Sequence, residues 1–167
     1  MLCRMVLVLV AIYPGTMNVA ICAEESPPAD RVASAIRRSI PLLEKAAAGS
    51  AKERQCFTCH SQALPVFALA EARKHGFQID QEVFHSQLEH TAAHLKRGLK
   101  GYLEGRGQGG RVMTAGYALW TLEAGDWKPD EITSAVTQYL LSFQKTDQRW
   151  HQAGTRPPSS GSDFANT

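Results

Sequence analysis

From residue 30 onward, apolar residues recur at helical spacing, and no segment shows the sustained alternation of a β-strand. In the first such segment, for example, Val32, Ile36, Ile40 and Leu43 fall on one helical face. The pattern predicts helices over about 30–48, 61–75, 81–97, 112–124 and 128–145. The sequence therefore predicts an all-α fold, built as helix hairpins joined by short turns.

Residues with known preferences for helix ends delimit these segments. Asp30 and Asp80 stand where N-caps are expected, and Gly49-Ser50 is expected to end the first helix. Pro41 lies inside that helix, so we expect the helix to kink there or to restart as a second one. Four glycines between residues 105 and 110 predict a break in the chain.

The last predicted helix starts at Lys128-Pro129-Asp130-Glu131. Proline is favoured in the first turn of a helix, and acidic residues there face the positive end of the helix dipole. We therefore expect Pro129 to lie in the first turn.

The first 23 residues follow the order of a secretory signal. Arg4 is their only charged residue, Met5 to Ile12 form a short apolar run, and small residues lead up to Ala23. The apolar run is shorter than the roughly 20 residues that a spanning helix needs. We expect residues 1–23 to be a signal peptide, residues 24–30 a polar lead-in, and the mature protein to have no membrane span and to be periplasmic or secreted. An uncleaved N-terminal anchor is the alternative.

Composition and charge restrict the partners further. The 167 residues are 44% hydrophobic and 20% charged, close to the globular average, and the formal net charge is +2. Lysine and arginine are spread along the chain rather than clustered. We therefore expect one domain of ordinary size and no nucleic-acid partner.

The segment Cys56-Phe57-Thr58-Cys59-His60 carries the clearest chemistry in the chain. C-x-x-C-H is the attachment signal of c-type haem, because two intervening residues let both thiols add to the vinyl groups on one porphyrin edge. The adjacent histidine then lies under the iron as the proximal axial ligand. The sequence therefore predicts one covalent haem c bound by Cys56 and Cys59, with His60 on the iron.

Three other interpretations of the two cysteines stay open. They could form a disulfide in an oxidising compartment. They could be a thioredoxin-like redox pair, although that motif needs a preceding strand. They could bind zinc together with His90 and His94, which stand one helical turn apart, although the 30 residues between Cys59 and His90 exceed the spacing of compact zinc fingers.

The sixth iron ligand has three candidates, Met113, His90 and His94. A thioether would raise the reduction potential relative to a second imidazole, and an open or water-bound position is equally compatible with the motif.

A second pattern lies toward the C-terminal end. Tyr139-Leu140, Gln144 and Trp150 stand in an order that resembles the glutamine–tryptophan repeat of the squalene–hopene cyclase and prenyltransferase superfamily. Gln148 stands where that repeat usually has glycine. The segment 114–120 also looks like an inner helix of the superfamily's α/α toroid.

Together the two patterns are similar to exported bacterial cytochrome c-like proteins with a cyclase-type toroid. The resemblance implies a haem-attachment helical region over 31–110 and the incomplete start of toroid repeats over 111–167. It also leads us to expect that the chain is the N-terminal part of a longer protein.

Three functions follow as hypotheses. The first is a periplasmic haem protein that transfers electrons to an unknown redox partner. The second is a terpenoid cyclase- or prenyltransferase-like enzyme fragment that binds an isoprenoid in an aromatic pocket; no Asp-x-Asp-Asp motif of an active cyclase occurs. The third is a haem-based sensor or interaction module. The residues suggested for the aromatic pocket are Phe67, Tyr117, Trp120 and Phe143.

Overall fold

The computed structural model describes residues 28–144, and within this range it contains helices and no strand. The prediction of an all-α fold is confirmed for this part of the chain. The predicted signal peptide and Trp150 lie outside the described residues. In chain order the elements are α1 (Ala29–Glu53), the short π-helix η1 (Cys59–Ala63), α2 (Leu64–Lys74), α3 (Gln81–Arg97), α4 (Leu99–Leu103), α5 (Arg111–Ala124) and α6 (Glu131–Phe143).

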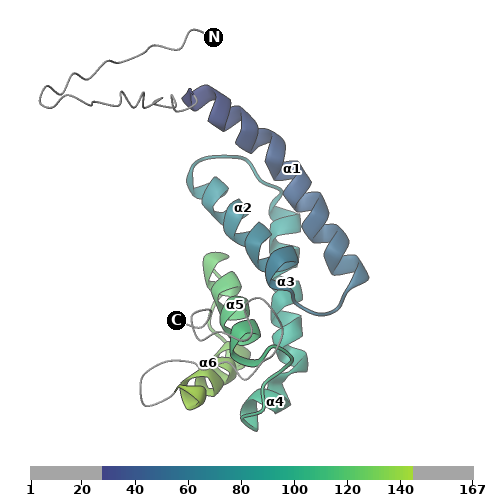
Figure 1. Ribbon diagram of the computed structural model, residues 1–167, viewed down its shortest axis with the longest axis vertical. Coiled ribbons are helices and arrows are strands. Elements are labelled where there is room, and N and C mark those ends of the chain that lie inside the picture. The colour runs from purple at the N-terminus through teal and green to yellow at the C-terminus, as the bar shows by residue number, and fades with distance from the viewer. Residues whose placement is uncertain (1–27, 145–167) are drawn as a thin grey trace, which may run out of the picture.

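The helices pack as successive hairpins around α3 (Figure 1). α1 and α2 run antiparallel, and α3 packs against both of them. α5 and α6 pack against α3 and against each other, and α5 also contacts α2 and η1. The short helix α4 contacts α6 at the end of the molecule far from the start of α1. The largest fully buried apolar side chains of the core are Val66, Leu69, Leu95, Val136 and Tyr139.

The ends of α3 agree with the sequence prediction, whereas α1 is longer than expected. The Asp80 carboxylate accepts hydrogen bonds from the backbone N–H groups of Glu82 and Val83, and Gly98 follows the last residue of the helix. α1 begins at Ala29 after Pro28 as its N-cap, so Asp30 lies in the first turn and the prediction that it caps the helix is wrong. The helix then continues through both Pro41 and Gly49 to Glu53. Pro41 is exposed and removes only one backbone hydrogen bond, and Gly49 does not adopt the left-handed φ that ends a helix.

The predicted glycine break is confirmed, and two details differ from expectation. Gly105, Gly107 and Gly110 all have positive φ, which explains the concentration of glycine. The extra helix α4 precedes this loop. Pro129 lies before α6 rather than in its first turn, because Asp130 is the N-cap and forms a capping box with Thr133.

Between residues 28 and 144, none of the helices combines the length and the apolar character needed to cross a membrane.

Candidate functional site

The C-x-x-C-H segment forms the turn that joins α1 to α2. Cys56 is exposed and Cys59 is half-buried, and both are free thiols. Cys59 begins η1 and packs against the hydrophobic core, and this burial raises the pKa of its thiol. His60 is the second residue of η1 and is exposed. The turn therefore presents one accessible thiol and one accessible imidazole, with the second thiol between them and the core.

Gln62 holds this turn from inside. Its side chain is fully buried, and its Oε1 accepts hydrogen bonds from both the backbone N–H and the hydroxyl of Thr58, each 2.8 Å long. Its Nε2 donates to the Ser50 hydroxyl at 3.3 Å. Since Ser50 lies in the last turns of α1, Gln62 connects the end of α1, the motif and η1. The sequence analysis did not identify this residue, and its spacing of four from Thr58 is the only signal for it.

Side chains from the C-terminal half of α3 contact the backbone of the same turn. His90, His94 and Arg97 lie on one face of α3 at helical spacing. His90 Nε2 lies 3.4 Å from the Cys56 carbonyl oxygen, and the Arg97 guanidinium donates to the Gln55 carbonyl. We call these three side chains the α3 clamp.

His94 is the buried member of the α3 clamp. Its ring lies 6.1 Å from the buried ring of Phe57, centroid to centroid, and its Nε2 is buried with no hydrogen-bond partner among the described residues. Burial, with smaller contributions from the charges of Arg97 and His90, lowers the His94 pKa to about 4. At neutral pH this imidazole is therefore uncharged, with an unused polar nitrogen close to the motif.

The alternatives for the cysteines can be compared with this arrangement. In the described range, no three or more histidine, cysteine, aspartate or glutamate side chains are grouped closely enough to hold a metal ion, so Cys56, Cys59, His90 and His94 are not assembled as a zinc site. The motif follows a helix, whereas a thioredoxin-like pair follows a strand. Among the candidate sixth ligands, Met113 is half-buried in the first turn of α5, which packs against η1.

The aromatic residues suggested for a pocket fall into two groups. Phe67 lies 4.3 Å from Trp120 between ring centroids, and Trp120 lies 6.2 Å from Tyr117. Phe143 packs instead on Tyr139, 5.1 Å away. Trp120 is 56% exposed. In the described residues these side chains therefore form ring contacts with one another and do not all face one cavity.

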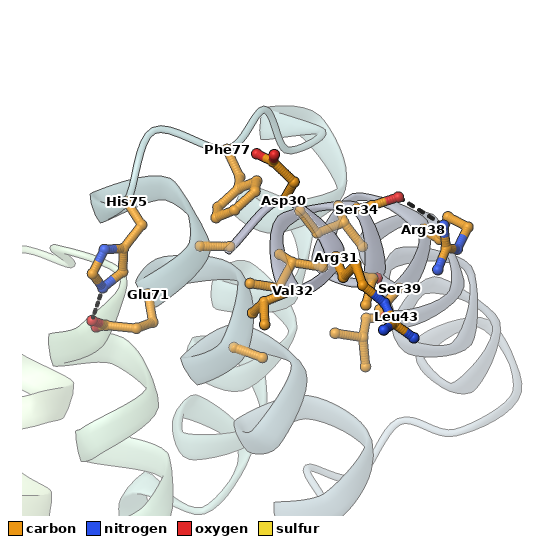
Figure 2. A pocket seen from close by; sticks show the side chains of 15 residues that line it. Asp30, Arg31, Val32, Ser34, Arg38, Ser39, Leu43, Glu71, His75 and Phe77 are labelled. Atoms are coloured by element: carbon orange, nitrogen blue, oxygen red, sulfur yellow. Dashed lines mark hydrogen bonds and ion pairs between the residues drawn. The ribbon is translucent and has the colours of Figure 1, made fainter. Parts of the chain in front are cut away.

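A large open groove lies between α1 and the C-terminal end of α2 (Figure 2). Its volume is about 1280 Å³, and its walls are apolar with a charged rim that includes Arg31 and Glu71. The α2 lining residue nearest the motif in sequence, Ala68, follows Cys59 by more than two helical turns. The groove is therefore separate from the C-x-x-C-H turn.

No protein-family model, curated protein or solved structure matches this chain. The resemblance to cytochrome c-like toroid proteins therefore stays a prediction, and the function is argued from the residues of the site.

Proposed function

We propose that this chain is an exported electron-transfer protein with one covalent haem c, attached to Cys56 and Cys59 and ligated by His60. The observation that carries the proposal is the form of the C-x-x-C-H turn. Both thiols are free, Cys56 and His60 are exposed, and the turn is short and connects two packed helices. This donor set fits a haem that approaches from solvent and is bound along one edge.

Each residue of the turn then has a separate role. Haem c, once bound, supplies one-electron exchange at its iron. Cys56 and Cys59 tether the group, and His60 donates its imidazole from the start of a helix, where the backbone fixes its direction. Gln62 and the α3 clamp hold the backbone of the turn. The geometry of Cys56, Cys59 and His60 therefore depends on side chains outside the motif.

The sixth ligand is proposed among His94, Met113 and His90. His94 has a neutral ring at pH 7 and an unpartnered Nε2, as an iron ligand requires. The Nε2 of His90 instead faces the Cys56 carbonyl. Met113 is a thioether candidate on the helix that packs against η1.

The suggested α/α toroid would be the scaffold that carries the haem. The hairpin α5–α6 contains Tyr139, Leu140 and Gln144 of the suggested repeat, and all-helical hairpins are what an α/α toroid requires. We propose that these hairpins form part of such a toroid and that it serves as scaffold. Electron transfer is favoured over cyclisation because the sequence has no Asp-x-Asp-Asp motif to protonate an isoprenoid.

Attachment of haem can be tested directly by mass. The chain would be exported in a host that matures c-type cytochromes, and the intact mass and a haem stain on a denaturing gel would be recorded. We expect the wild type to carry the mass of one haem and, when reduced, to show the α-band of a c-type haem. Absence of haem from the wild type would make the proposal wrong.

Variants separate the roles of the three residues. Cys56→Ala and Cys59→Ala should each lose one thioether bond, and the double variant should lose covalent haem altogether. His60→Ala should retain a covalent link while the visible spectrum changes, because the proximal ligand is removed. The matched control is His85→Ala, another exposed histidine, which should leave mass and spectrum unchanged.

A further inference from the structure

An exposed apolar surface begins one helical turn after His60. Leu64 is 56% exposed and lies four residues after His60, so both side chains face the same side of the η1–α2 segment. Phe67 follows on the side of α2 that faces α5, where its ring contacts the ring of Trp120 with the centroids 4.3 Å apart and the planes tilted by 38°. Trp120 is itself 56% exposed. We call Leu64, Phe67 and Trp120 the α2–α5 apolar strip.

The residues at the start of the motif are already in contact with α3. There the α3 clamp binds the backbone of residues 55 and 56, and the buried ring of Phe57 packs against His94. The shallow groove on this side, between the end of α1 and α3, includes the polar and charged side chains of Lys52, Glu89 and His90. A porphyrin face is apolar and is stabilised by removal from water, and this groove offers it alanine methyl groups but no large apolar side chain, so it is the poorer place for the group.

We infer that the haem lies against the α2–α5 apolar strip, with Leu64 and Trp120 in contact with the porphyrin. The inference rests on the proposed attachment at Cys56, Cys59 and His60, and it adds the side of the molecule on which the group lies. The covalent bonds to the haem start at residues 56 and 59, and the proposed iron ligand is residue 60. The α2–α5 apolar strip begins four residues later, at Leu64, so it follows the attachment residues along the chain. Binding there covers two exposed apolar side chains, Leu64 and Trp120, and of the three proposed sixth ligands it favours Met113 of α5, because His90 and His94 belong to the α3 clamp.

Methyl NMR of the holoprotein tests this placement. The protein would be labelled with ¹³C at leucine methyl groups, reduced and treated with carbon monoxide so that ring-current shifts are measured on a diamagnetic haem. We expect the Leu64 methyl signals, identified by their absence in Leu64→Ile, to move upfield relative to the haem-free Cys56→Ala/Cys59→Ala protein. Leu141 is the matched control because it is 53% exposed and lies on α6, and its signals should not move.

A second measurement uses the reduction potential. Leu64→Gln places a polar group on the strip and should lower the potential while the covalent haem mass is retained, because a wetter haem favours the oxidised, more highly charged state. Leu141→Gln should leave the potential unchanged.

Two kinds of failure are distinguishable. A protein with the haem mass whose Leu64 signals stay in place would overturn the placement and leave the proposed function intact. So would a second sample, labelled at alanine methyl groups, in which the shifted signals belong to Ala48 and Ala93 of the groove between α1 and α3. A protein without haem mass would overturn both.

Discussion

Among single residues, Gln62 shows how a polar side chain can be essential inside a core. Both of its polar atoms are hydrogen-bonded, to Thr58 and to Ser50, and the side chain is fully buried. A glutamine that follows a loop motif is usually taken for a surface residue, so composition and periodicity did not reveal it. Its role depends on the end of α1 returning to the motif, which is a tertiary contact.

Replacement of this residue should destabilise the protein. Gln62→Leu keeps a similar volume but leaves the Thr58 backbone N–H without its buried acceptor, so we expect a loss of about 1–3 kcal/mol in the free energy of unfolding. Chemical denaturation monitored by circular dichroism measures it. Gln138→Leu is the control, since Gln138 is exposed on α6 and the change there should stay within about 0.5 kcal/mol. Equal losses in the two variants would contradict the role of Gln62.

His94 should make stability depend on pH. Its folded-state pKa is about 4, against 6.5 for the ordinary side chain, so the unfolded chain binds more protons between these values. The contribution is complete above pH 6.5 and is lost as the pH falls toward 4, with a slope of at most about 1.4 kcal/mol per pH unit. Urea midpoints at several pH values would show this loss. It should be smaller in His94→Gln and unchanged in His85→Gln; an unchanged slope in His94→Gln would contradict the assignment.

At the scale of elements, prediction succeeded where the signals are local. α3 begins after an aspartate cap and ends before a glycine, and both signals lie within the helix and its neighbours. The end of α1 and the start of η1 could not be predicted, because the Gln62–Ser50 contact between them joins residues 12 positions apart. α4 was missed because five residues are too few to show a period.

The loop between α4 and α5 allows a test of why glycine is required at position 107. Gly107 has φ +65°, and a Cβ there would lie 2.5 Å from the Tyr139 hydroxyl oxygen. Gly107→Ala should therefore lower the free energy of unfolding by about 1–3 kcal/mol, through backbone strain and through the clash. Thermal denaturation would measure the loss.

Two other glycines separate these effects. Gly76 has φ +80° with nothing near the added Cβ, so Gly76→Ala should show the strain alone, about 1–2 kcal/mol. Gly109 has neither feature, so Gly109→Ala should be near neutral. If Gly107→Ala were no worse than Gly76→Ala, the close approach of Tyr139 would be wrong.

For the whole molecule, the sequence predicted which residues share a helix face, but it did not predict which other segment of the chain packs against that face. The sequence made His90 and His94 of α3 candidates for the sixth iron ligand, and their spacing of one helical turn made them candidates for a zinc site. The structure adds that this face contacts residues 55–57, and that Arg97 belongs to it. Contacts over more than 30 residues depend on how the hairpins pack, which a pattern along the chain does not encode.

The central position of α3 leads to a prediction for the fold. Leu95 is fully buried on α3, which packs against α1, α2, α5 and α6. Leu95→Ala should remove about 2–5 kcal/mol and lower the midpoint of the whole unfolding transition, because every hairpin contacts this helix. Leu103→Ala, at an exposed leucine of α4, is the control and should change little. Calorimetry of the two variants measures the effect, and two separate transitions in Leu95→Ala would show that the hairpins unfold independently.

The π-helix at Cys59–Ala63 gives this segment one residue that the direction of His60 does not need. A π-turn holds one residue more than the α-turn it replaces, so deletion of Ser61 would allow η1 to become α-helical and continuous with α2. His60 would then stand three residues before Leu64 instead of four, and both spacings place two side chains on the same side of a helix. The π-helix therefore stores a surplus residue beside the proposed iron ligand, and its removal would shorten the chain without turning the imidazole to another side of the molecule.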